Sequence, residues 1–280
     1  KGRAGIHKQK QWIPAFAGMT KILTLLFCWT LSPSVQAQAE GAPLFAPVEE
    51  PARKLFVGER LVYQIRYLGI PIGRAEAEVG EIQEVQGRRA YPIRVNVRSY
   101  FVIDLLYKVR DEHRSFMDVE KLHSLAYEKN IREGPHRMRR SIVYDHSTHR
   151  AVFFDEKGNK KKGMPVPDNI QDEVSCGYWF RTLPLAPNTS IDIPVHADEK
   201  TWNLKVKIYG ASQLEIPKIG RFEALEVEPL MEFQGIFVRR GRIRGWISLD
   251  ERRIPLRMKV KIPVLGSIVA ELIEYSPGRE

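Results

Sequence analysis

Polar and apolar residues alternate along most of the chain between residues 60 and 262. In an early segment Tyr63 and Ile65 fall on one face, and Gln64 and Arg66 fall on the other. A period of two is typical of a half-buried strand, because successive side chains point to opposite faces. The same alternation recurs over residues 75–79, 93–98, 204–208 and 258–262. One apolar and one polar face indicate an antiparallel sheet.

Turn residues separate these segments at the spacing of successive hairpins. They lie at residues 69–73, 86–87, 145–149, 157–159, 218–220, 240–241 and 265–266. We expect about 12–14 strands on these signals. A sheet of that size twists and curls, so the chain is predicted to be mainly β, with a strongly curved antiparallel sheet that forms a half-barrel or an incompletely closed barrel or spiral. A β-sandwich is the alternative.

One segment breaks the alternation and predicts a helix over residues 168–183. Asp168 can cap its start, and Ile170, Val174 and Tyr178 recur near the helical period before Pro184 ends it. We expect this helix to lie against the opening of the curved sheet or along its hollow.

The N-terminal region has the features of an export signal. Lys21 is followed by an apolar run over residues 22–31, then Pro33, then small residues at Ala37 and Ala39, in the order of a cleavable signal peptide. Residues 6–20 resemble a peptide that arises when a dispersed palindromic DNA repeat of bacteria is translated. We therefore predict a spurious extension over 1–18, a start at Met19, a signal peptide over 19–39 cleaved after Ala37 or Ala39, a Pro-rich mobile arm over 40–54 and a single β domain over 55–280.

Length and charge narrow the possible partners. The apolar run is about half of the roughly twenty residues that cross a bilayer, so we expect no transmembrane segment in the mature chain. Residues 1–39 contain five basic and no acidic residues, so cleavage lowers the formal charge from +10 to +5. The remaining basic residues are scattered singly, which argues against nucleic acid as a partner. Cleavage also removes Cys28 and leaves Cys176 without a disulfide partner.

No reaction is indicated by the candidate reactive groups. His146 and His149 have a spacing that could begin a metal site, but they fall in a predicted turn without further ligands. Cys176 could be a nucleophile, yet no histidine adjoins it in sequence, and filling of the core by a small residue is the simpler interpretation. The chain has neither the nucleophile elbow of a serine hydrolase nor a Gly-rich phosphate loop. We expect no catalytic residue, no metal and no cofactor.

Aromatic and cationic side chains on two elements are the candidate ligand-binding residues. Arg242 and Arg244 share a strand face with Trp246, opposite Ile243 and Ile247. A tryptophan on the polar face of a strand packs either against a neighbouring element or in the wall of a ligand groove. The predicted helix raises the same alternatives. The candidates are Tyr178, Trp179, Arg181, Arg242, Arg244 and Trp246.

Four short blocks occur in order along the chain. They are Gly58–Leu61 with Tyr63; Leu68–Gly73; Asp172 with Ser175, Tyr178, Arg181, Pro184 and Leu185; and Trp246–Ser248 with Asp250 and Arg253–Pro255. Together, from about Phe56 to Tyr275, they resemble a bacterial family of exported proteins, the domain-of-unknown-function family 3108. Cys176 stands where a small apolar residue is expected in that family. The resemblance implies an exported, mainly β protein and carries over no reaction and no catalytic residue.

Export and a curved sheet together lead to one functional hypothesis. We expect a periplasmic, non-enzymatic protein of the cell envelope that binds a lipid or other amphiphilic ligand in a groove of the sheet. One alternative is an envelope-assembly factor that binds a protein partner through an exposed face and the Pro-rich arm. An enzyme that acts on cell-wall material is the other alternative.

Overall fold

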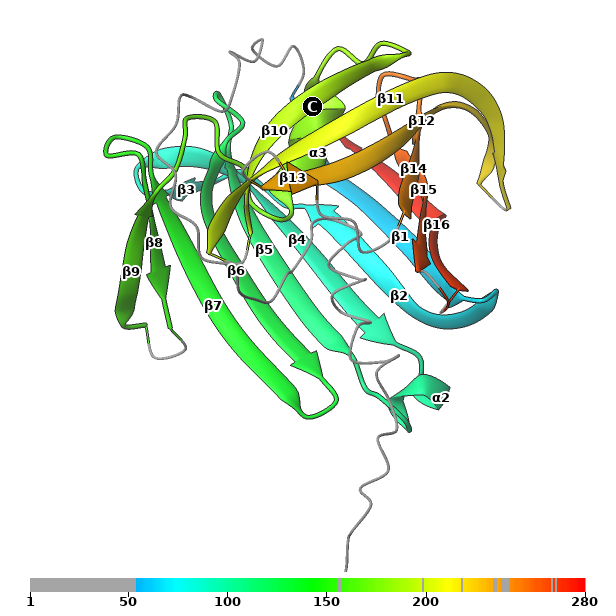
Figure 1. Cartoon of the computed structure of the whole chain (residues 1–280), viewed down its shortest axis with the longest axis horizontal. Coiled ribbons are helices and arrows are strands. Elements are labelled where there is room, and N and C mark those ends of the chain that lie inside the picture. The colour runs from blue at the N-terminus through cyan, green and yellow to red at the C-terminus, as the bar shows by residue number, and fades with distance from the viewer. Residues whose placement is uncertain are drawn as a thin grey trace, which may run out of the picture.

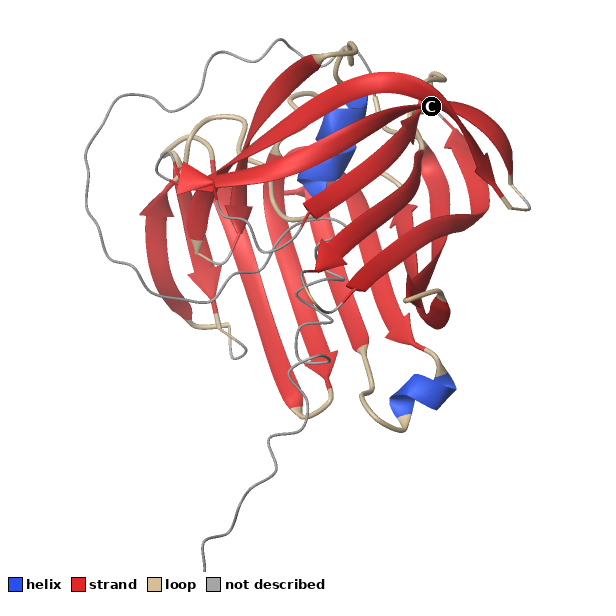
Figure 2. Ribbon diagram, turned by 45° about the vertical axis from the view of Figure 1, so that its right-hand side comes forward, coloured by secondary structure: helices blue, strands red, loops and turns tan. Residues whose placement is uncertain are grey.

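The computed structural model describes residues 54–279, apart from 156–157, 198, 218, 234–235, 238–241, 263 and 265. The predicted extension over 1–18, the signal peptide over 19–39 and the predicted arm up to residue 53 lie outside the described residues. Strands dominate the described part, as the alternation predicts, and two helices accompany them (Figure 2).

Sixteen strands and two helices make up the described part of the chain. In chain order they are β1 (Val57–Tyr67), β2 (Ile70–Val79), β3 (Gln83–Val85), β4 (Arg88–Ser99), α2 (Phe101–Asp104), β5 (Arg110–Asp118), β6 (Ser124–Glu133), β7 (His136–Asp145), β8 (Arg150–Phe154), β9 (Lys160–Pro165), α3 (Ser175–Thr182), β10 (Thr189–Ala197), β11 (Lys200–Ile216), β12 (Gly220–Phe233), β13 (Ile236–Phe237), β14 (Arg242–Ser248), β15 (Pro255–Ile262) and β16 (Gly266–Arg279).

The strands form one antiparallel sheet. Their order is β10-β11-β12-β14-β15-β16-β1-β2-β4-β5-β6-β7-β8-β9, with β3 paired to β4 and β13 paired to β12. This confirms the predicted class, a mainly β fold with one large antiparallel sheet that does not close into a barrel. The predicted number of 12–14 strands is slightly low, because β3 and β13 have three and two residues and are too short to show a period.

The sheet rolls up until its β10 edge meets the interior of its other half (Figure 1). Gln171, which precedes α3, donates its N–H to the Pro194 carbonyl at 2.9 Å and accepts the His196 N–H at 2.7 Å. The neighbouring Ile170 carbonyl accepts the Ser124 N–H at the start of β6. A short connecting segment therefore links β10 to β6, so that one end of the roll is held together without a closed ring of strands.

Alternation along each strand divides core from surface. On β2, Ala75, Ala77 and Val79 are fully buried, whereas Glu76 on the opposite face binds Arg60 of β1 at 2.6 Å. The buried face lines the inside of the roll, where α3 lies (Figures 1 and 2). The strand assignments from sequence follow from this division, since the core takes every second residue.

The helix near residues 168–183 exists, but it is shorter than predicted. It covers Ser175–Thr182, because Ile170 and Gln171 are held by the sheet and Asn169 has a positive φ of 57°. Asp168 is not its cap. The Asp172 Oδ1 instead accepts the N–H groups of Val174 at 2.7 Å and Ser175 at 2.8 Å. The prediction that the helix ends before Pro184 is confirmed, with Leu183 as the last cap residue.

The second helix, α2, is a single turn between β4 and β5 that the sequence did not predict. Neither α2 nor α3, the helices of the described residues, is long and apolar enough to cross a membrane.

Candidate functional site

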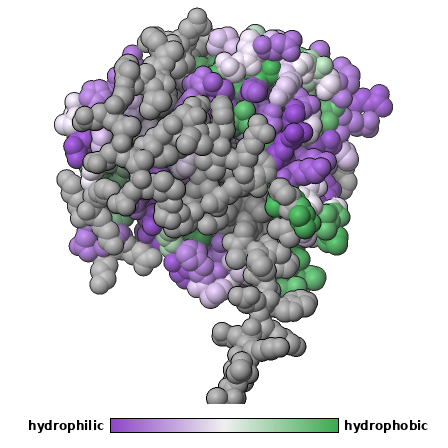
Figure 3. Space-filling view, in the orientation of Figure 1, coloured by the Kyte–Doolittle hydropathy of each residue, from purple (hydrophilic) through white to green (hydrophobic). Residues whose placement is uncertain are grey.

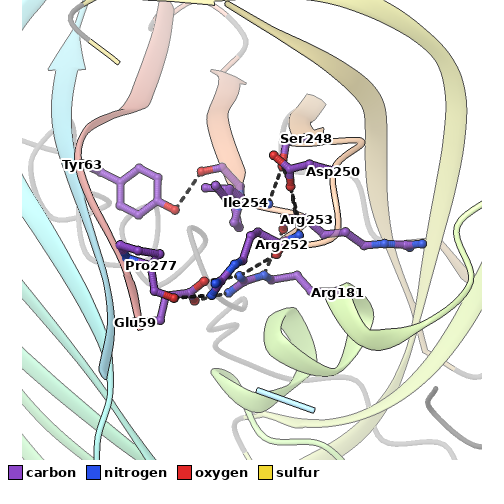
Figure 4. Close-up of polar contacts among 10 residues, drawn as sticks. Glu59, Tyr63, Arg181, Ser248, Asp250, Arg252, Arg253, Ile254 and Pro277 are labelled. Carbon is purple, nitrogen blue, oxygen red and sulfur yellow. Dashed lines mark hydrogen bonds and ion pairs between the residues drawn. The ribbon is translucent and has the colours of Figure 1, made fainter. Parts of the chain in front are cut away.

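A buried ion pair anchors α3 to the sheet. Arg181 donates from both terminal nitrogens to the Glu59 carboxylate, at 2.7 and 2.6 Å (Figure 4). Both side chains are buried. Gly278 of β16 passes so close to Glu59 that a Cβ on it would lie 2.4 Å from the Glu59 nitrogen, and its φ is +63°. Only glycine therefore fits beside the Glu59 backbone at this position.

The same guanidinium holds the turn between β14 and β15. Arg181 donates to the backbone carbonyls of Arg252 and Arg253, each at 3.0 Å. The turn is shaped from within by Asp250, whose carboxylate accepts the N–H groups of both arginines and the Ser248 hydroxyl. One side chain on α3 thereby fixes the positions of β1, the turn and the helix relative to one another.

Two tyrosines stand beside this pair. Tyr63 donates to the Pro255 carbonyl at 2.8 Å, and the ring of Tyr178 lies 5.2 Å from the Arg181 guanidinium, within range of a cation–π contact. Burial, with a further contribution from Glu59, raises the pKa of Tyr178, and burial likewise raises the pKa of Tyr63. Burial disfavours the charged form of Arg181, but the Glu59 carboxylate outweighs it and raises the Arg181 pKa. Arg181 is therefore charged and both tyrosines are neutral at physiological pH.

An apolar cavity of about 140 Å³ lies between α3 and the inner face of the sheet. Its walls come from β1, β10–β12 and β14–β16, with side chains such as Leu61, Ile193, Leu204, Val206, Val227 and Met258. Gly177 borders the cavity from α3, and a Cβ built on it would meet no atom within 4 Å. The Tyr178 hydroxyl is buried and has no hydrogen-bond partner among the described residues.

The six candidate ligand-binding residues separate into three groups. Tyr178, Arg181 and Trp246 border the cavity. Trp179, 2 % exposed, lies in the core and is not among the lining residues. Arg242 and Arg244 lie on the opposite face of β14 from Ile243, and Arg244 binds Glu226 and stacks over the Tyr209 ring on that face. Trp246 shares their face by its position in the alternation, as predicted, but the pairing of β14 with β15 is irregular between Trp246 and Ile247, and both of these residues border the cavity.

A second polar cluster is buried under the middle of the sheet. Lys129 of β6 binds Glu173 at 2.7 Å, and the Tyr127 hydroxyl joins Glu173 to the ring of His113. Burial, and secondarily Lys129, lowers the pKa of His113 to about 3, so this ring is neutral. None of these four residues lines the cavity.

Sequence reasoning missed both polar groups, although each left a signal. The buried face of β5 carries polar residues at every second position, Asp111, His113 and Ser115. They follow the same period of two that marks core residues in a strand. Glu59 stands in a family-like block, yet nothing in the sequence pairs it with Arg181, 122 residues away. Long-range pairing of charges is set by the roll of the sheet.

The two histidines of the predicted turn, His146 and His149, do not converge on a shared metal site. His146 stacks on His123 with ring centroids 3.5 Å apart, and His149 binds Asp168 at 2.9 Å. Within the described part of the chain, no three His, Cys, Asp or Glu side chains converge as metal ligands.

The fold and the site define a class: an open, barrel-like antiparallel β protein in which a helix and a buried ion pair close one end above an apolar cavity. The chain belongs to the family described as protein of unknown function, DUF3108, whose profile matches residues 62–273. The resemblance seen in the sequence is thus confirmed. Three of its four blocks come together in space, since Glu59, Tyr63, Arg181, Ser248 and Asp250 all lie around the same helix end (Figure 4).

One solved structure shares the overall fold. A beta-barrel-like protein of the domain of unknown function DUF1849 from Brucella abortus superposes with a TM-score of 0.55 at 11% identity, over 80% of this chain and 99% of that one. A Bacteroides fragilis protein with a YmcC-like fold gives a TM-score of 0.35 at 8% identity, over 80% of this chain and all of that one. A comparison with the curated proteins finds no match.

Proposed function

We propose that this chain is an exported, non-enzymatic protein of the cell envelope that binds the apolar part of a lipid or similar amphiphile in the cavity beside α3. The observation that carries the proposal is the cavity between α3 and the inner face of the sheet, whose walls are almost entirely apolar. An empty apolar cavity leaves its walls without contact partners on one side, so an apolar ligand group would restore those dispersion contacts.

The size of the cavity supports a partial fit of such a ligand. About 140 Å³ is close to the volume of cavities that accept a benzene ring. It would accept the end of an acyl chain or one ring, and the rest of the molecule would extend past Gly177, which is half-buried. Arg181 is neutralised by Glu59, so its charge does not select an anionic headgroup.

The chemistry of the walls supports binding without catalysis. Among the described residues that line the cavity there is no His, Asp, Glu or Lys, the usual general bases. Tyr63 and Tyr178 are held neutral by their raised pKa values. Cys176 borders the cavity, but no lining imidazole or carboxylate could activate it. Export to the periplasm is supported by the signal-like segment over 19–39.

A titration with a fluorescent fatty-acid analogue tests the proposal. Gly177→Leu would place a large side chain where a Cβ meets nothing, so it should fill the cavity and weaken binding at least tenfold. The matched control is Gly210→Leu, an exposed glycine of β11 where a Cβ also meets nothing. The proposal fails if the wild-type chain does not bind the analogue, or if both leucine variants bind it equally well.

A further inference from the structure

Seven large apolar side chains are exposed at one end of the rolled sheet. Their exposed fractions run from 62% to 105%. They are Leu68, Ile70, Phe101, Val102, Leu105, Leu106 and Val264. We call this set the apolar tip. In the described part of the chain only one other large apolar residue is counted as exposed, Leu249 at 40%, and it follows β14 in the turn next to α3.

Three connections that are distant in sequence form the tip. The Leu68 N–H donates to the Ser267 carbonyl at 3.1 Å, which joins the β1–β2 turn to the β15–β16 turn that carries Val264. The Tyr100 N–H donates to the Ile72 carbonyl at 3.0 Å, which joins α2 to β2. Figure 3 shows hydrophobic side chains gathered at the edge where Figure 1 places α2 and the β1–β2 turn.

In the connection that contains α2, the acidic side chain points inward and the apolar side chains point outward. Its one acidic residue, Asp104, points toward the protein, where Ser99 and Arg110 bind it. Hydrogen bonds from Arg110 outweigh the cost of its partial burial and lower the Asp104 pKa. Phe101 and Leu106 on the same connection are 77% and 73% exposed. The polar group anchors the connection while the apolar groups face outward, the reverse of an ordinary surface turn.

The surroundings of the tip are positively charged. Exposed cations lie on the adjoining strands and turns, at Arg98, Lys108, Arg132, Arg137 and Lys261. The β6–β7 turn that carries Arg137 is tied to α2 by the Gly134 N–H, which donates to the Lys108 carbonyl at 2.8 Å. The two carboxylates of these turns are withdrawn from the surface, since Asp104 binds Arg110 and Glu133 is buried.

We infer that the apolar tip docks on an anionic lipid bilayer, with its aliphatic and aromatic side chains inserted at the headgroup boundary and the surrounding cations on the lipid phosphates. Protruding apolar side chains combined with basic residues are what binding to such an interface requires. A peptide partner needs a groove, and a second copy needs a flat complementary face. The tip has neither shape, because its side chains project from three separate turns.

The tip lies apart from the cavity. Tyr63 of β1 lines the cavity, and Leu68, which directly follows β1, belongs to the tip. They are five residues apart, which is about 17 Å along an extended chain. The docking surface is thus separate from the cavity, and the inference stands whether or not the cavity binds a lipid.

Sedimentation with vesicles tests the inference on the full chain, produced in a Gram-negative host and recovered after export. Vesicles of phosphatidylglycerol and phosphatidylcholine should bind the wild type at least tenfold more tightly than they bind Phe101→Ser/Leu105→Ser/Leu106→Ser. Leu249→Ser is the matched control and should bind like the wild type, as should Gly177→Leu, whose cavity is filled. Pure phosphatidylcholine should bind the wild type several-fold more weakly.

A second variant covers the case in which the triple variant fails to fold. Phe101→Trp keeps an aromatic residue on α2, and brominated lipids in the mixed vesicles should quench its added fluorescence. The inference is overturned if the wild type does not sediment with the mixed vesicles, if the folded triple variant binds like Leu249→Ser, or if the Phe101→Trp fluorescence is unquenched. Self-association of the wild type that the triple variant abolishes, without vesicle binding, would assign the tip to a second copy and also overturn it.

Discussion

Arg181 makes four hydrogen bonds that join α3 to β1 and to the β14–β15 turn. It neutralises Glu59, and it supports two carbonyls of the β14–β15 turn. Charges buried to this degree are stabilising only as a complete set, because an unpaired charge in the interior has lost its hydration without replacement. The pair is therefore a weak source of net stability and a strong constraint on geometry.

Breaking this pair should reveal that constraint. Glu59→Gln and Arg181→Met should each lower the free energy of unfolding by about 3–5 kcal/mol, since each leaves a buried polar group uncompensated. The double variant should recover part of that loss, because neither charge then remains. Urea denaturation of the four chains measures the coupling. Single variants that lose less than about 1 kcal/mol would show that the pair is not buried as described.

The burial of His196 predicts that the protein loses stability in mild acid. This residue is fully buried against Tyr144 and Phe153, and neither ring nitrogen has a hydrogen-bond partner among the described residues. Burial, and then Lys129, lowers its pKa to about 4. The unfolded chain binds this proton near pH 6.5, so the stability contribution of the neutral ring is complete above that pH and is lost as the pH falls from 6.5 toward 4.

His196→Leu should remove this loss. Between pH 7.5 and pH 5 the wild type should lose about 2 kcal/mol more stability than the variant. At pH 7.5 the variant should be as stable as the wild type or more so, because two unpaired ring nitrogens are replaced by apolar atoms. Urea denaturation at both pH values measures this, with the exposed His136→Leu as control. An equal loss in the wild type and His196→Leu would contradict the assignment.

At the scale of elements, α3 shows what local sequence signals can and cannot supply. The C-terminal end of α3 could be predicted from the helical spacing and from Pro184, because these signals are local in sequence. Its start depends on tertiary contacts: Ile170 and Gln171 bond to β6 and β10, and this prevents the helix from beginning at Asp168. The cap is Asp172, which also binds the hydroxyls of Ser115 at 2.6 Å and Ser124 at 2.5 Å.

The two aspartates give a direct test of the helix start. Asp172→Ala should lower the free energy of unfolding by about 2–4 kcal/mol, because two backbone N–H groups and two hydroxyls lose their acceptor in a buried place. Asp168→Ala should change it by less than about 0.5 kcal/mol, since that side chain is exposed and its ion pair is with the exposed His149. Thermal and urea unfolding compare them. A larger cost at Asp168 would restore the helix start expected from sequence.

Strands were easier to predict than the sites between them. Period two is imposed on each strand by burial of one face, so β1, β2, β4, β11 and β15 could be identified from their own residues. The candidate residues on β14 were assigned to the correct face by the same period. Their grouping into one wall with α3 was an inference about distance, and the alternation along β14 leaves Arg242 and Arg244 on the opposite face from the cavity.

At the scale of the whole molecule, the open roll leaves α3, rather than another strand, to complete one end. Gly177, a residue without a side chain, borders the cavity from the helix, and a Cβ on it would meet no atom within 4 Å. From the number of strands and one predicted helix, the sequence favoured an incompletely closed curved sheet with the helix at its opening or along its hollow, and left a β-sandwich as the alternative. The volume and chemistry of the space beneath the helix depend on packing among eight elements and could not be predicted.

Native mass spectrometry tests the central claim most directly. The full chain, exported by a Gram-negative host and purified without detergent, should carry one extra mass that organic extraction identifies as lipid. Gly177→Leu should lack that mass and Gly210→Leu should retain it, with all three chains equally folded. A wild-type chain that shows only its own mass, or an extra mass that Gly177→Leu retains in full, would contradict the assignment of the cavity as a lipid site.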